Sequence, residues 1–561
     1  MKALARKGNT LPTEPRSHTS WSAASLWGMA GLVAAAGYLV CLHPSFPPQS
    51  DAWDYAQEAR QLVRGEGLTS LYTYPVHLAQ AGPPFPVHWR MPLFAALGAV
   101  LLRIGIPLPF GFLLLGMIGH AFVVALVYSL GRRLHSATAG KVAAGIAIMC
   151  PLLLDSYNPG MSQVPATALA LAVWCLLLRG QSLMAVAGAG ILGALAWYLR
   201  AESALMLPLW LLAIISSQGT AHFEGSARPA VRKRWEANWR RGGLFLLTYS
   251  VTILPWLAFI ARQHGTMSPI RGNPMLLYTR EYPGYSSARI MGGEYPGALE
   301  YVLNHPVAFA FRYVKDATGY VVDLLSGLGP IAVGLGIAGV FLVCIRREVI
   351  TEPVRNFKLP DAASMALFLA IPVQIGVLSA LERSPRFLVP VVPIACILLG
   401  VVAGGAVSRL RSRRFVFLLL ALMIAERAAV VAFQRADAGR RFPPLPNELA
   451  QALHPLASHW PDQALLLTDI PDWAAWHLDR PALLLPMWGS LPAVTSSHDT
   501  VGILLSSDAR GRNASDGDAE WVNVVDAFRP IPGFEGPMVL PGGSRLYLTL
   551  RGSQQDEGGH P

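Results

Sequence analysis

The stretch LWGMAGLVAAAGYLVCL, residues 26–42, carries no charge and is long enough to form most of a membrane-spanning helix. It follows a basic start that includes Arg6 and Lys7, as a secretory signal peptide would. Its length and the lack of a small-residue cleavage site favour a retained anchor. More apolar runs follow along the chain, so this stretch predicts the first helix of a series.

The composition indicates a polytopic α-helical membrane protein. Of the 561 residues, 53% are hydrophobic and only 14% are charged, and the mean hydropathy is +0.40. We expect about eleven transmembrane helices, several of them short. The apolar segments fall at 24–43, 108–131, 140–154, 165–178, 181–199, 203–217, 243–262, 326–345, 363–381, 386–407 and 415–434.

Basic clusters set the orientation. With a cytoplasmic N-terminus over residues 1–23, the basic loops at 132–133, 228–241, 346–347 and 408–414 all fall inside, as the positive-inside rule requires. This alternation holds only if residues 91–105 do not span, so they are expected to form an amphipathic helix at the outer interface. The net charge of +11 therefore reflects topology, and no nucleic-acid partner is predicted.

Three regions then face the periplasm or exterior. Two are loops of the transmembrane domain 24–434, at 44–107 and 263–325, and the third is a small α/β domain over 435–550. Four short β-like runs, separated by Pro, Gly and Asp, predict its strands. They are ALLLTDIP, HLDRPALLLP, TVGILLSS and SRLYLTLR. Residues 551–561 are expected to be disordered.

The first outer loop begins with SDAWDYAQEARQLVRGEGL, residues 50–68. Its apolar positions, among them Trp53 and Leu62, recur at helical spacing, which predicts a short helix on the membrane with Asp51 near its start. An acid at that position is typical of a helix cap. Because this helix is expected in an outer loop, a catalytic role for Asp51 is the alternative.

Several motifs, in order, resemble the GT-C glycosyltransferases. Within this superfamily the chain resembles the branch of protein mannosyltransferases, aminoarabinose transferases and RgtA-to-D-like bacterial enzymes. The motifs are short, and their order and sidedness carry the resemblance. They are Asp51-x-x-x-Tyr55-x-x-x-Ala59-Arg60-x-Leu62-x-x-Gly65-x-Gly67-Leu68, Arg90-Met91-Pro92-Leu93, LAWYLRAESALMLPLWLL at 195–212, PWLAFIARQHGTMSPIRGN at 255–273 and ERSPRFLVPVVPIACILLG at 382–400.

The resemblance implies transfer of a sugar from a polyprenyl-phosphate donor at the outer face. Asp51 matches the family's catalytic base. Asp54 is a second catalytic candidate, although it stands where the family more often has an aromatic or neutral residue. Asp155, in the second outer loop, is a further catalytic candidate, with a turn or cap as its alternative. The family's acid before the following helix is replaced by Gln163, which leaves a second-carboxylate or metal role there unsupported.

Arginines are expected to hold the lipid phosphate, because their planar donors bind phosphate oxygens bidentately and stay protonated. Arg90 matches the family's basic residue before the Pro-Leu pair, and Arg200, Arg383 and Arg386 lie at outer helix ends. Structural ion pairs, of Arg200 with Glu202 and of Arg383 with Glu382, are the alternative.

The substrate pocket is expected to include Tyr55, His88, Trp89 and Glu202, although an ordinary aromatic belt is the alternative for the aromatic side chains. No His/Asp/Glu cluster has the spacing of metal ligands, so neither a metal site nor a cofactor is predicted, and a divalent cation stays an open question.

The expected partners are the lipid-linked donor, membrane lipids and a lipid, glycan or protein acceptor, in a bacterial inner membrane. The alternatives are a transporter or lipid flippase, and a polysaccharide polymerase or ligase of another family. A transporter would place ionisable groups in the middle of its helices, whereas most charges here lie at helix ends and in outer loops.

Overall fold

The computed structural model describes residues 19–42, 50–80, 82–87, 90–157, 161–179, 182–216, 228–264, 284, 288–291, 298–345, 362–381, 383–409, 421–430, 432 and 447–550. His88, Trp89, Glu382 and residues 551–561 lie outside them, so the predictions made for these residues are not addressed by the structure.

Every predicted apolar segment overlaps a helix. Among the described residues, two helices, over Phe110–Leu134 and Trp235–Arg262, are long and apolar enough to cross a membrane, and a bent pair with a 98° turn at Gly329 adds a third candidate. That eleven segments cross the membrane therefore stays a prediction. The helices are α1 (Thr19–Leu42), α4 (Leu108–Leu134), α5 (Ala137–Met149), α6 (Pro151–Tyr157), α7 (Gln163–Arg179), α8 (Leu183–Leu199), α9 (Leu207–Ser216), α10 (Arg228–His264), α13 (Pro330–Ile345), α14 (Ala362–Leu378), α15 (Val392–Arg409) and a helix over 421–430.

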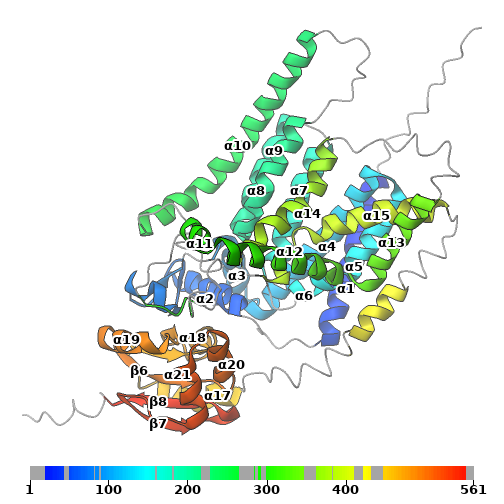
Figure 1. Cartoon of the computed structure of the whole chain (residues 1–561). Coiled ribbons are helices and arrows are strands. Elements are labelled where there is room, and N and C mark those ends of the chain that lie inside the picture. The colour runs from blue at the N-terminus through cyan, green and yellow to red at the C-terminus, as the bar shows by residue number, and fades with distance from the viewer. Residues whose placement is uncertain are drawn as a thin grey trace, which may run out of the picture.

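Further elements, most of them short, connect these helices (Figure 1). The predicted helix at 50–68 is present as α2, and the one at 91–105 is present as α3. At 12 residues α3 is about 18 Å long, too short to cross a bilayer. These elements are α2 (Ser50–Arg64), η1 (Pro75–Gln80), α3 (Pro92–Arg103), η2 (Ala201–Met206), α11 (Ala298–Asn304), α12 (Pro306–Leu328) and η6 (Pro385–Leu388), with β1 (Thr69–Ser70) paired antiparallel to β3 (Phe85–Pro86).

Small residues allow α15 to pack closely against α5. A Cβ at Gly400 would lie 2.7 Å from the carbonyl oxygen of Ala139, and one at Gly404 would lie 2.7 Å from its Cα. Glycines four residues apart allow helix backbones to approach this closely, as in membrane helix pairs. The packing fixes the second half of α15, and this helix begins a few residues after η6, which carries Arg386.

The C-terminal region contains a six-stranded sheet in the order β2-β5-β4-β6-β8-β7. The first four strands are parallel, and β8 and β7 run antiparallel at the far edge. The four predicted strands are present, as β4, β5, β6 and β8. The elements are α17 (Asn447–Ala457), β4 (Leu465–Thr468), α18 (Pro471–Leu478), β5 (Ala482–Leu484), η7 (Trp488–Ser490), α19 (Leu491–Ser497), β6 (Thr500–Leu505), α20 (Ala509–Ser515), α21 (Ala519–Ala527), β7 (Phe534–Val539), η8 (Pro541–Gly543) and β8 (Arg545–Thr549).

The edge strand β2 (Tyr72–Thr73) comes from the first outer loop, so the sheet extends beyond the expected boundary at residue 435. Tyr72 lies opposite Ala482 and Thr73 opposite Leu483, and the amide of Ala482 donates to the carbonyl of Leu71 at 2.8 Å. The outer loop and the C-terminal region therefore form one unit.

Candidate functional site

The acids of α2 lie on a buried face. Asp51, Asp54 and Glu58 are 3%, 2% and 1% exposed. Residues three, four and seven positions apart share one side of a helix, which places the three carboxyl groups in a row. Carboxylates buried this deeply need cationic partners or must become protonated.

Arg90 and Arg386 meet the carboxylate of Asp51 from opposite parts of the chain. Arg90 precedes α3, and its Nη2 donates to Oδ1 of Asp51. Nη1 of Arg386, in η6, donates to Oδ2 at 2.7 Å. Burial alone would raise the pKa of Asp51, but the charges of the surrounding arginines outweigh it and hold this pKa below its usual value. Asp51 is therefore ionised at neutral pH, with an arginine on each oxygen.

Asp54 is in a different state. Nε of Arg90 donates to its Oδ2 at 2.6 Å, while Oδ1 is buried and has no hydrogen-bond partner among the described residues. Burial raises the pKa of Asp54 to about 7; Arg90 opposes this shift and the neighbouring charge of Asp51 adds to it. The two acids of the motif therefore differ, since one is firmly ionised and the other titrates near neutrality.

Arg200 forms an ion pair with Glu202, which is the role expected for it as the alternative to phosphate binding. Nη2 of Arg200 lies 2.5 Å from Oε1 of Glu202, and Nη1 is buried with no hydrogen-bond partner in the described part of the chain. The charge of Arg200 is close enough to help lower the pKa of Asp51. The structure thus places Arg200 beside the cluster without direct contact to Asp51.

Arg383 forms a different ion pair from the one expected. Its Nη2 lies 2.6 Å from Oδ1 of Asp323 in α12, and its side chain is 37% exposed. The neighbouring Arg386 instead contacts Asp51. Arg383 and Arg386, three residues apart, therefore contact different carboxylates.

Asp155, at the end of α6, pairs with Arg427 rather than with the arginines of Asp51. Nη2 of Arg427 lies 2.5 Å from Oδ1 of Asp155, and the hydroxyl of Tyr38 donates to the same oxygen. Arg427 was missed in the sequence. A buried cation in an apolar helix, here only 4% exposed, was the available signal.

Tyr55 packs beneath the acids. Its hydroxyl lies 2.9 Å from Oγ of Ser162, its ring meets Phe94 edge-on, and the guanidinium of Arg90 lies 6.0 Å from its ring centre. At 2% exposure Tyr55 positions the helix rather than lining an open surface.

Sequence reasoning also missed Glu58 and Asp472. Burial, with the charge of Asp54 added, raises the pKa of Glu58 well above its usual value. Asp472, at the start of α18, adds to the negative field at Asp54. Among the described residues, no three His, Cys, Asp or Glu side chains are grouped so that they could hold a metal ion.

Solved structures show what this architecture is similar to. The aminoarabinose transferase ArnT from Cupriavidus metallidurans, in a structure with bound undecaprenyl phosphate, superposes with a TM-score of 0.55 at 13% identity, over 95% of this chain and 98% of ArnT. The chain therefore has the same fold as this GT-C glycosyltransferase.

A second match has the same fold. The Archaeoglobus fulgidus oligosaccharyltransferase superposes with a TM-score of 0.52 at 12% identity, over 94% of this chain and 75% of the other. Neither a protein-family model nor a curated protein matches the sequence. The fold is therefore shared with GT-C enzymes across great sequence distance.

Proposed function

We propose that this GT-C protein transfers a sugar from a polyprenyl-phosphate donor to an acceptor at the outer face of a bacterial inner membrane. The observation that carries the proposal is the contact of Arg90 and Arg386 with Asp51. A carboxylate beside two arginines provides the general base and the phosphate ligands that such a transfer needs. The similarity to ArnT, whose structure holds undecaprenyl phosphate, supports the class of donor.

The arginines would move from Asp51 to the donor. Nε of Arg386 is buried with no hydrogen-bond partner among the described residues, so this guanidinium has donor capacity left for a phosphate oxygen. When the lipid phosphate engages Arg90 or Arg386, an oxygen of Asp51 is released. Donor binding would therefore expose the base at the moment it is needed.

The chemical step follows from these roles. The acceptor oxygen or nitrogen attacks the anomeric carbon, and the bond from that carbon to the phosphate oxygen breaks. The electron pair leaves with the lipid phosphate, which the arginines stabilise, and Asp51 takes the acceptor's proton. Attack opposite the leaving group inverts the anomeric centre.

The experiment compares Asp51→Asn with the unaltered protein, purified in nanodiscs and supplied with radiolabelled polyprenyl-phosphate sugars. We expect Asp51→Asn to lower transfer by about 10²–10⁴-fold while keeping the folded state, because the base is lost. Full activity in this variant would remove the proposed base. Movement of the intact lipid-linked sugar across the membrane of proteoliposomes, without cleavage of its bond to the phosphate, would instead indicate a flippase.

A further inference from the structure

The parallel part of the C-terminal sheet has a topological switch point. The chain runs from β4 to β5 on one side and then crosses to β6 on the other side of β4. In open α/β sheets, ligands bind in the crevice outside the carboxyl ends of the strands at such a point. Asp469 follows β4 and Ser506 follows β6, so both lie at this edge.

A pocket of about 220 Å³ lies at this edge. Its polar lining comes from the residue after β4, from helix α20 and the residue after it, and from one distant arginine. These residues are Arg289, Asp469, Arg512, Asn513, Ser515 and Asp516.

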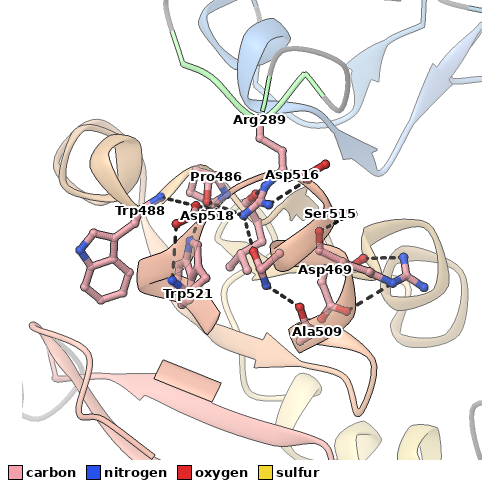
Figure 2. Close-up of polar contacts among 12 residues, drawn as sticks. Arg289, Asp469, Pro486, Trp488, Ala509, Ser515, Asp516, Asp518 and Trp521 are labelled. Atoms are coloured by element: carbon pink, nitrogen blue, oxygen red, sulfur yellow. Dashed lines mark hydrogen bonds and ion pairs between the residues drawn. The ribbon is translucent and has the colours of Figure 1, made fainter. Parts of the chain in front are cut away.

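Two buried networks hold the pocket in shape. Arg289 extends into the C-terminal domain toward Asp516 (Figure 2). Its Nη1 lies 2.9 Å from Oδ2 of Asp516, and its Nη2 donates to Oδ1 of Asn513 at 2.6 Å. Asp469 accepts from the amide and the hydroxyl of Ser506, at 2.8 and 2.6 Å. The lining is therefore preorganised.

The charges of the lining balance. Arg289 and Arg512 face Asp469 and Asp516, so the pocket offers both donors and acceptors and no net charge to attract an anion. Arg512 is 54% exposed, and it keeps donor capacity beyond its bond to the carbonyl of Asp469. Vicinal hydroxyl groups, which donate and accept together, suit such paired carboxylate and guanidinium groups.

The pocket is connected to the cluster of α2 through Asp472. This residue lies in the first turn of α18, three positions after Asp469, and its charge acts on Asp54, while the charges of Arg512 and Asp469 act on Asp472. Helix α18 also packs on α2, where Arg60 donates to the carbonyl of Ala475 at 2.9 Å. The pocket thus lies at the carboxyl edge of β4, two residues before α18 begins.

We propose that the pocket between Arg289, Asp469 and Arg512 binds an uncharged saccharide unit of a glycan acceptor. This assignment rests on the proposed glycosyl transfer and specifies its acceptor as a glycan, held by the C-terminal domain while the reacting group reaches α2. A lipid or protein acceptor without sugar would not use this pocket.

The test is saturation-transfer NMR on the full chain in nanodiscs, with glucose, galactose, mannose and their disaccharides as probes and no donor present. Arg512→Ala should weaken the binding of the responding sugar about tenfold, because it removes charge-assisted hydrogen bonds. Arg510→Ala is the matched control. Arg510 lies on the same helix, is 60% exposed and pairs with Asp526 outside the pocket.

Three outcomes would overturn the assignment: no signal from any sugar, equal loss in the two variants, or displacement of the sugar by inorganic phosphate. Cleavage of the lipid-linked donor is measured on the same preparations. Normal cleavage without sugar binding would reject only the saccharide site, whereas sugar binding without cleavage would reject the proposed transfer.

Discussion

At the scale of single residues, the motif separates two acids that the sequence presents almost as equals. One carboxylate oxygen of Asp51 accepts a hydrogen bond from Arg90 and the other accepts one from Arg386, whereas Asp54 accepts a hydrogen bond from Arg90. With Asp54 ionised, the two acids neutralise Arg90 and Arg386, and with Asp54 protonated the group carries one net positive charge. The pKa of Asp54, raised by burial to about 7, places this change near neutral pH.

This predicts how donor binding depends on pH. Below about 7 Asp54 is neutral and the extra positive charge favours the lipid phosphate, so the KM for the donor should rise about tenfold as the pH increases through this value. Asp54→Asn should keep the low KM at every pH and retain transfer. Initial rates between pH 5.5 and 8.5 measure this, and loss of transfer in Asp54→Asn would instead make Asp54 the base.

Arg383, which lies just before η6, offers a matched comparison with Arg90. Arg90→Lys should raise the donor KM about tenfold, because an ammonium group cannot replace the planar fork on a phosphate. Arg383→Ala should change it little, since Arg383 pairs with Asp323 and is 37% exposed. Equal effects on the donor KM would argue against a phosphate site at Arg90.

At the scale of elements, α2 is the contact between the helical body and the C-terminal sheet. Arg60 stacks on Trp476 at 4.6 Å and donates to two carbonyls at the end of α18, whereas Arg64 makes a bidentate pair with Asp479 at the surface. The buried contact is expected to dominate, because exposed ion pairs contribute little.

We therefore expect Arg60→Ala to weaken the docking of α18 by about 1–2 kcal/mol and Arg64→Ala by at most ~1 kcal/mol. Hydrogen exchange of the amides in α18 measures the difference, with faster exchange in Arg60→Ala. An unchanged exchange rate in Arg60→Ala would show that other contacts hold the domain in place.

Elements with a strong local signal could be predicted from the sequence, and pairings across long separations could not. Apolar runs located the helices, and alternation with turn residues located β4, β5, β6 and β8. Strand β2 is two residues long and pairs with residues 482 and 483, so nothing local marks it. Motifs singled out Asp51, Arg90 and Arg386, which the structure brings together, whereas the place of Asp472 near Asp54 depends on packing that no single segment encodes. Arg427 had a local signal as a cation in an apolar helix, but its pairing with Asp155 had none.

At the scale of the whole molecule, the mixed sheet determines which regions of the chain lie on the same side of the membrane. Because β2 belongs to the first outer loop and β5 to the C-terminal region, the two must lie on the same side of the membrane. The contact of Arg386 with Asp51 places the start of α15 at that side as well. A single label in the C-terminal domain thus reports the side of the whole candidate site.

The final prediction concerns that side. Ser496→Cys introduces an exposed thiol in α19, and His135→Cys introduces one between α4 and α5, next to a basic pair expected to face the cytoplasm. A membrane-impermeant maleimide should label Ser496→Cys in intact spheroplasts and His135→Cys only after permeabilisation. The unaltered protein, which has five native cysteines, measures the background labelling, and three of them, Cys150, Cys175 and Cys396, are buried. Labelling in the reverse order would place Asp51, Arg90 and Arg386 at the cytoplasmic face, where a donor on the outer leaflet could not reach them.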